Sequence, residues 1–124
     1  MRRALAAAVV LLLTACATPE ATDATSVELY DGSIDASSTR LTAGDVSIGI
    51  ENEGEFTHTL VITTADGTVV TATDLVSPGE ETELHVELAP GEYQFTCRLV
   101  TQTPDGQIID HYQLGMVRTV TVGA

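Results

Sequence analysis

Apolar and polar residues alternate along several short stretches of the chain, and a period of two is typical of β-strands with one buried face. Residues 46–50 alternate branched apolar side chains with serine and glycine, and residues 83–88 alternate leucine or valine with glutamate or histidine. Residues 93–99 place two aromatic side chains, a cysteine and a leucine on one face. The apolar run at 59–63 indicates a central strand, and the β-branched stretch at 117–122 indicates a last one.

Turn-forming residues separate these stretches, and no segment has the pattern of an amphipathic helix. The turns are expected at Asp31-Gly32, Ala43-Gly44, Asn52-Glu53-Gly54, Asp66-Gly67, Ser77-Pro78-Gly79, Ala89-Pro90-Gly91 and Pro104-Asp105-Gly106. Short strands at this spacing predict an all-β fold, a Greek-key β-sandwich of about seven to eight strands.

The first 15 residues have the features of a secretory signal peptide. A positively charged start precedes the apolar run 4–13, which is shorter than the roughly 20 residues needed to cross a bilayer. The run ends in Leu13-Thr14-Ala15-Cys16, which resembles the bacterial lipobox, whose cysteine becomes the lipid-carrying first residue of the mature protein. The alternative is an ordinary signal peptide followed by a coincidental cysteine.

Three segments follow from this pattern. Residues 1–15 are expected to be a lipoprotein signal peptide, and residues 16–26 a lipidated Cys16 with a flexible polar tether. Residues 27–124 are expected to form the folded domain. The protein should therefore be exported and held by its lipid at the outer face of the cytoplasmic membrane, or be periplasmic or at the cell surface.

The charge of the chain limits its partners. Its 18 acidic residues outnumber five basic ones, for a net charge of −13, and beyond residue 15 only Arg40, Arg98 and Arg118 are basic. Such a charge argues against binding nucleic acid or an anionic lipid surface. We expect a monomer whose acidic surface is well solvated and whose protein partner, if charged, is basic.

Cysteine usage points to a metal. If Cys16 is lipidated, Cys97 is the only remaining thiol and cannot form an internal disulfide, and an unpaired thiol in an exported domain needs protection from oxidation. His58, Cys97, His111 and Met116 follow one another along the chain. Two imidazoles, a thiolate and a weak thioether are the donors of type 1 copper sites, which suit both oxidation states of the ion.

Three motifs around these residues resemble those of the cupredoxin family of blue-copper proteins. Asn52-Glu53-Gly54 followed by His58 is similar to the family's N-x-G…H segment, and residues 90–97 are similar to its P-G-x-Y-x-F-x-C strand. Residues 111–116, followed by the stretch 117–122, are similar to its H-x4-M loop and last strand.

The resemblance covers residues 27–122 and implies a role for each donor. His58 and His111 would be the nitrogen ligands, Cys97 the thiolate and Met116 the axial ligand. Two features depart from the family's pattern: thirteen residues separate Cys97 from His111, where the family has only a few, and Thr59 replaces the asparagine that often follows the first histidine.

The long segment between Cys97 and His111 predicts a hairpin. If residues 104–106 form its loop, Thr103 pairs with Gln107 and the numbers of paired residues sum to 210. Leu99 then lies opposite His111, and Cys97 opposite Gln113. Cys97 and His111 become diagonal neighbours, whose Cβ atoms lie about 7–8 Å apart or less. The insertion therefore extends outward and returns the histidine to the cysteine.

Each donor also has a simpler interpretation. Cys97 and Met116 are compatible with plain core positions, His111 with a solvated loop and His58 with a strand end. Their order within the matching strands and turns favours copper. His85 lies between Glu83 and Glu87 on the polar face of its strand and is expected to be a surface residue.

These residues favour a carrier over an enzyme. Only His85 would remain as a nitrogen donor for a second copper centre, and a closed four-ligand site leaves no position for a substrate. The leading hypothesis is one-electron transfer by a single type 1 copper with a redox partner at a membrane face. The alternatives are copper sequestration or delivery to a copper-exchange partner, and a metal-free β-sandwich that serves as a cell-surface interaction module.

Overall fold

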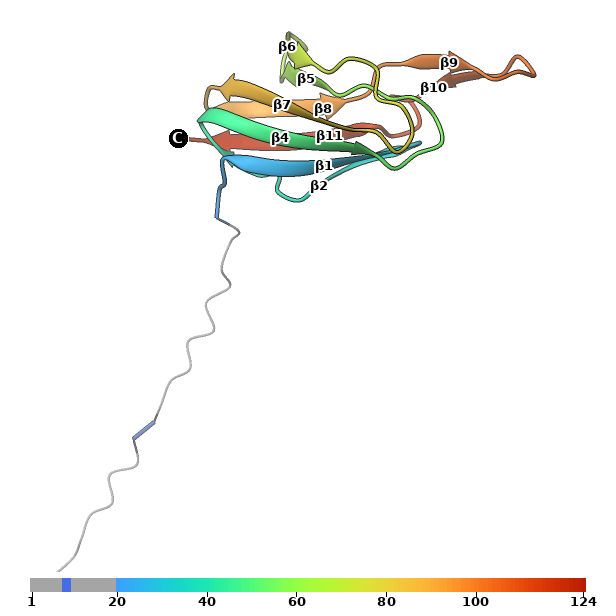
Figure 1. Ribbon diagram of the computed structural model, residues 1–124. Helices are drawn as coiled ribbons and strands as arrows, with labels where there is room; N and C mark the ends of the chain where they lie inside the picture. Colours follow the sequence, from blue (N-terminus) through green and yellow to red (C-terminus); the bar gives the residue numbers. More distant parts are fainter. Residues whose placement is uncertain (1–7, 10–19) are drawn as a thin grey trace, which may run out of the picture.

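A computed structural model describes residues 8–9 and 20–124 as a β-sandwich from which one hairpin projects (Figure 1). The expected lipidation site, Cys16, most of the expected signal peptide and the first part of the tether lie outside the described residues. Within the described part, no helix has the length and apolar character needed to cross a bilayer.

Eleven strands form two main sheets and a separate hairpin within the described residues. The first sheet has the order β2-β1-β4-β7, from β1 (Ala24–Tyr30), β2 (Ser33–Ala36), β4 (Gly44–Asn52) and β7 (Glu81–Leu88). The second has the order β3-β11-β8-β5-β6, from β3 (Arg40–Thr42), β5 (Val61–Thr64), β6 (Val69–Ala72), β8 (Gly91–Thr96) and β11 (Val117–Gly123). The hairpin consists of β9 (Val100–Gln102) and β10 (Ile108–Asp110).

The connections cross between the two sheets, as expected for a Greek-key sandwich. The chain passes from β4 to β5, returns from β6 to β7, and crosses again from β7 to β8. β1 runs parallel to β4 and β3 runs parallel to β11, whereas the other pairs are antiparallel. The all-β fold class is confirmed.

The strands expected from period-two patterns are all present, and the structure adds shorter ones. β2, β3 and β6 have only three or four residues each, which is too short for a pattern to be visible in the sequence. β1 begins at Ala24, three residues before the expected start of the domain. The reason is Thr25, which is buried and whose hydroxyl donates to the backbone oxygen of Ser38 over 2.9 Å.

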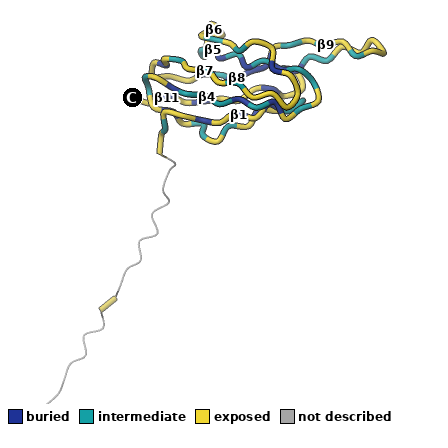
Figure 2. Tube along the Cα trace, viewed as in Figure 1, coloured by how far each residue is buried: buried dark blue, intermediate teal, exposed yellow. Residues whose placement is uncertain are grey.

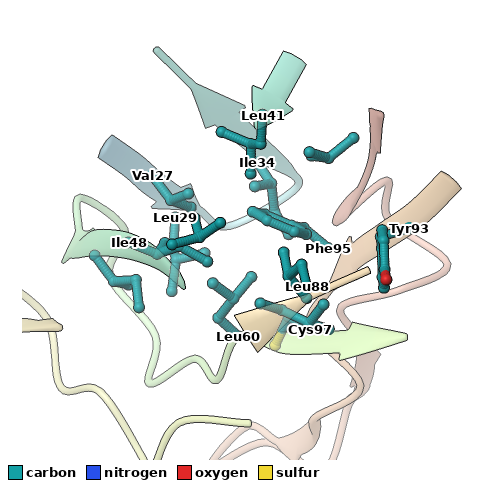
Figure 3. Packing of buried hydrophobic residues seen from close by; sticks show 14 of the residues in the cluster. Val27, Leu29, Ile34, Leu41, Ile48, Leu60, Leu88, Tyr93, Phe95 and Cys97 are labelled. Atoms are coloured by element: carbon teal, nitrogen blue, oxygen red, sulfur yellow. The ribbon is translucent and has the colours of Figure 1, made fainter. Parts of the chain in front are cut away.

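The core fills the space between the sheets and reaches one end of the sandwich. The alternating strand residues supply most of it, including Leu29, Ile48 and Phe95, each 0% exposed. Figure 3 shows Cys97 within the same cluster, and buried and exposed positions alternate along the strands in Figure 2. The β9–β10 hairpin leaves the sandwich at the end away from the C-terminus (Figure 1).

Candidate metal centre

The four expected donors come from four loops or strand ends at one end of the sandwich. His58 follows β4 and is held by a bridge to Val76, and Cys97 comes directly after β8. His111 follows β10, and Met116 directly precedes β11. All four side chains are completely buried.

Short contacts bring these donors together. The His58 Nδ1 and Cys97 Sγ atoms lie 3.9 Å apart, and the centroids of the His58 and His111 rings lie 4.7 Å apart at 89°. The Cys97 amide donates to the Met116 oxygen at 3.2 Å, and the Met116 amide donates to the His111 oxygen at 3.1 Å. The fold therefore brings His58 against both Cys97 and His111, and backbone hydrogen bonds place Met116 next to Cys97 and His111.

The second imidazole carries a polar atom that the protein leaves without a partner. His111 Nδ1 is buried and is the one such side-chain nitrogen or oxygen among the described residues that has no hydrogen bond. A buried polar atom without a partner costs about 1–3 kcal/mol. The His111 ring lies against that of His58, which in turn contacts the Cys97 sulfur, and these residue types fit the donor set of a soft metal ion.

The outward-facing nitrogens of both rings are already occupied. His58 Nε2 lies 2.9 Å from the Asp31 carboxylate, and His111 Nε2 lies 3.1 Å from the Thr101 hydroxyl. Histidines that bind a metal usually have the remote ring nitrogen held by such an oxygen, which fixes the tautomer and the ring orientation. Both Nδ1 atoms are therefore the ones available to a metal.

The spacing of the donors is compatible with one ion. A nitrogen and a sulfur bound at about 2.0 and 2.3 Å to the same ion are at most about 4.3 Å apart, which the 3.9 Å between His58 and Cys97 satisfies. Among the described residues, no three histidine, cysteine, aspartate or glutamate side chains lie together as a group that could hold a metal ion. The fit of the four residues to a copper ion rests on donor type, burial and the unpaired nitrogen of His111.

Neighbouring groups favour the thiolate that a metal requires. Burial raises the pKa of the Cys97 thiol, but contacts with His58 and with the backbone amides of Thr59 and Leu99 outweigh it and leave the pKa below its ordinary value. Burial lowers the pKa of His111, and the neighbouring His58 lowers it further. Burial also lowers the pKa of His58, but its contacts with Cys97 and Asp31 outweigh burial and raise it. A neutral His111 and a stabilised Cys97 thiolate are the protonation states that bind a metal.

Asn52 shapes the loop that carries the first histidine. Its side chain is buried and donates to the backbone oxygens of Phe56 and Val76, both at 2.8 Å, while its own oxygen accepts from the Gly54 amide at 2.8 Å. Val76 is also the partner that pairs with His58. The N-x-G motif therefore acts by fixing the loop backbone.

The hairpin between Cys97 and His111 has the predicted register. Gln102 pairs with Ile108, the Thr103 amide donates to the Gln107 oxygen at 2.9 Å, and the His111 amide donates to the Leu99 oxygen at 3.1 Å. The expectation that Cys97 lies opposite Gln113 is wrong. Residues 111–115 form turns, so that the chain shortens and Cys97 meets Met116 instead.

Thr59 and His85 can also be compared with the sequence analysis. The Thr59 hydroxyl lies 4.0 Å from Cys97 Sγ, so it links the segment that carries His58 to the one that carries Cys97. His85 is a surface residue as predicted, 71% exposed and 3.1 Å from a Glu83 carboxylate oxygen. Asp31 was assigned only to a turn, and no local signal in the sequence connects it with His58.

Comparisons with known proteins agree with this architecture. The family model described as a cupredoxin-like domain matches residues 3–109, a span that ends before His111 and Met116. Comparison with curated proteins finds no match.

Three solved structures are similar over most of this chain. Reduced auracyanin from the photosynthetic bacterium Roseiflexus castenholzii is 19% identical, with a TM-score of 0.67 over 85% of this chain and 100% of that one. Auracyanin A, described as a "blue" copper protein from Chloroflexus aurantiacus, is 18% identical, with a TM-score of 0.57 over 81% and 99%. A purple cupredoxin from Nitrosopumilus maritimus is 17% identical, with a TM-score of 0.53 over 79% and 98%. At these identities the likeness shows a shared fold.

Proposed function

The chain belongs to the family of cupredoxin-like domains, and from this premise we propose that it binds one type 1 copper ion and carries single electrons at the outer face of a membrane. His58 and His111 would bind the ion through Nδ1, Cys97 through its thiolate and Met116 through its thioether. When bound, the copper supplies a one-electron change of oxidation state.

The observation that carries this proposal is the unpaired Nδ1 of His111. It is buried beside the His58 ring, whose own Nδ1 faces the Cys97 sulfur at 3.9 Å. A metal-free interaction module would gain nothing from burying two imidazoles and a thiol with one nitrogen unsatisfied. The donor set favours copper because it combines soft sulfur with imidazole.

The protein's part in electron transfer is to hold the donors still and exclude water. All four side chains are 0% exposed, and backbone hydrogen bonds link Cys97 to Met116 and Met116 to His111. Donors held in this way move little when the charge of the ion changes. Small rearrangement is the property that distinguishes an electron carrier from a storage protein.

The membrane location rests on the sequence before the domain. Lipidation of Cys16 would keep the carrier beside membrane-bound donors and acceptors, and the tether would let it move between them. Metabolic labelling with a fatty-acid analogue tests this point: the wild-type chain should be labelled and the Cys16→Ser variant should not. Equal labelling of both, or of neither, would contradict the anchor.

Electron self-exchange tests the carrier role against copper storage or delivery. The purified chain loaded with copper should exchange electrons between its oxidised and reduced forms rapidly, with a reversible voltammetric response. Slow exchange, or loss of copper on reduction, would instead indicate a sequestration or delivery protein.

A further inference from the structure

One charged group touches the metal centre without belonging to the expected donors. Asp31 lies in the turn between β1 and β2, and its Oδ1 atom accepts a hydrogen bond from His58 Nε2 at 2.9 Å. Its carboxylate also accepts from the backbone amides of Glu55 at 3.0 Å and Phe56 at 3.2 Å. One side chain therefore holds both the imidazole and the loop that leads to it.

Two glycines make room for this arrangement. A Cβ atom on Gly54 would lie 2.2 Å from Asp31 Oδ1 and 2.8 Å from His58 Nε2. A Cβ on Gly115, whose φ is +119°, would lie 2.6 Å from the Gly32 oxygen. The absence of side chains at these positions lets the turn that carries Asp31 approach both the His58 loop and the 111–116 loop.

The carboxylate determines which ring nitrogen of His58 carries a proton. An ionised carboxylate only accepts hydrogen bonds, so Nε2 must donate, and in the neutral ring that binds a metal Nδ1 then keeps its lone pair. Nδ1 is the atom that faces the Cys97 sulfur at 3.9 Å. His111 has a neutral partner in the same position, the Thr101 hydroxyl. The two imidazoles therefore differ in the charge placed behind them.

A charged acceptor has an effect that a neutral acceptor lacks. His58 is completely buried, whereas the Asp31 side chain is 36% exposed, so the carboxylate lies between the buried ring and solvent. Its negative charge polarises the ring and makes Nδ1 a stronger donor. The same charge stabilises the oxidised ion over the reduced one, because the oxidised ion carries one more positive charge.

On the basis of the copper-binding function proposed above, we propose that Asp31 is a positioning residue that fixes the tautomer and orientation of His58 and lowers the reduction potential of the bound copper. The carboxylate acts through the imidazole and does not touch the metal. Asp31→Asn keeps the shape of the side chain and removes its charge, and Asp31→Ala removes the acceptor as well.

The test measures two properties of the full chain. Voltammetry of the copper-loaded protein, with the electrode as the electron source, gives the reduction potential. Nitrogen-15 NMR of the metal-free protein gives the tautomer of His58. Asp66→Asn is the matched control, because it removes the same charge from the turn after β5. This turn lies away from Cys97: the last residue of β5, Thr64, pairs with Tyr93 near the start of β8, whereas Cys97 follows the end of β8.

We expect Asp31→Asn to shift the potential upward, with no shift in Asp66→Asn. In the metal-free protein, at a pH above the raised pKa of His58, the neutral ring should carry its proton on Nε2. Asp31→Ala should give a mixture of tautomers and bind copper about 10–100-fold more weakly. Gly54→Ala, which displaces the carboxylate without removing it, should also give a mixture of His58 tautomers.

An unchanged potential in Asp31→Asn, an equal shift in Asp66→Asn, or an unchanged tautomer in Asp31→Ala would overturn the role of Asp31. The NMR arm needs no metal. A wild-type chain that takes up no copper would contradict the proposed function, while the tautomers would still decide whether Asp31 positions His58.

Discussion

At the scale of single residues, polar side chains supply the hydrogen bonds that buried polar groups need and that apolar core residues cannot provide. Asn52, Asp31 and Thr101 each place a side-chain oxygen or nitrogen against the loops of the metal centre. Buried polar groups are stable only when they are paired, so each of these residues should contribute measurably to folding. The unpaired His111 Nδ1 is the exception that a metal ion would remove.

Asn52→Ala tests the buried amide. The substitution removes two donors and one acceptor and leaves the buried Val76 oxygen with one partner fewer. We expect the free energy of unfolding of the metal-free protein to fall by about 3 kcal/mol, measured by urea denaturation. Asn52→Asp keeps the acceptor for the Gly54 amide but sets a buried carboxylate oxygen against the Phe56 and Val76 oxygens, so it should destabilise the protein at least as much. Wild-type stability in both variants would show that the loop does not depend on Asn52.

The pH dependence of stability tests the Asp31 carboxylate in the metal-free protein. Burial raises its pKa, but hydrogen bonds from Glu55, Phe56 and His58 outweigh burial and hold the pKa below its ordinary value of 3.8. A lowered pKa in the folded state stabilises the protein above the unfolded pKa, and this contribution disappears as the pH falls through the folded pKa.

The stability advantage of the wild type over Asp31→Asn should therefore be present at about pH 6 and be lost as the pH falls below the ordinary carboxyl value of 3.8. Urea denaturation of both proteins across this range measures it. An advantage that stayed constant at low pH would mean that the ionised carboxylate is not the stabilising form.

At the scale of elements, the β9–β10 hairpin is the insertion between Cys97 and His111, where the family has only a few residues. A two-stranded hairpin alone is marginally stable in water, so its base must hold it to the sandwich. The Arg98 guanidinium lies 3.8 Å from the centroid of the Tyr112 ring, and Thr101 on β9 contacts the second imidazole. The insertion therefore contributes a residue that contacts an expected ligand of the candidate metal centre.

Thr101→Val measures that contribution. The substitution keeps the shape of the side chain and leaves His111 Nε2 without its partner, so the free energy of unfolding should fall by about 1–2 kcal/mol and copper should bind more weakly. Thr119→Val, at an exposed position of β11, is the matched control. If denaturation and copper titration gave the same results for both variants, the hairpin would not contribute to the site.

Sequence patterns predicted elements where the pattern was long or the turn chemistry was specific. β4 and β7 show a clear period of two, and Pro104-Asp105-Gly106 set the register of the hairpin because Gly106, with a φ of +87°, favours a tight turn. The expected donors stand out because cysteine, methionine and histidine are rare in this chain. Asp31 was not identifiable, because it lies 27 positions before His58 and meets it only through the packing of separate loops.

At the scale of the whole molecule, charge is the dominant surface property. The chain has a net charge of −13, and like charges face one another directly in the first sheet, as at Glu51, which pairs with Glu28 on one side and Glu81 on the other. Such a surface repels other copies of the chain and attracts cationic proteins over a range set by the ionic strength.

Electron transfer with a cationic redox protein should therefore slow as salt is added. Stopped-flow rates with a basic cytochrome should fall steeply as ionic strength rises, because screening removes the attraction between opposite charges. Rates with an uncharged small-molecule oxidant serve as the control and should change little. Equal salt dependence with both partners would contradict a basic partner.

The most direct measurement of the central claim is a Cu(II) titration followed by visible absorption, carried out in a Cys16→Ser background so that Cys97 is the only thiol. We predict an intense thiolate-to-copper charge-transfer band that saturates at one copper per chain and is abolished by Cys97→Ser. A chain that stays colourless, or a band that survives Cys97→Ser, would contradict a copper centre built on this residue.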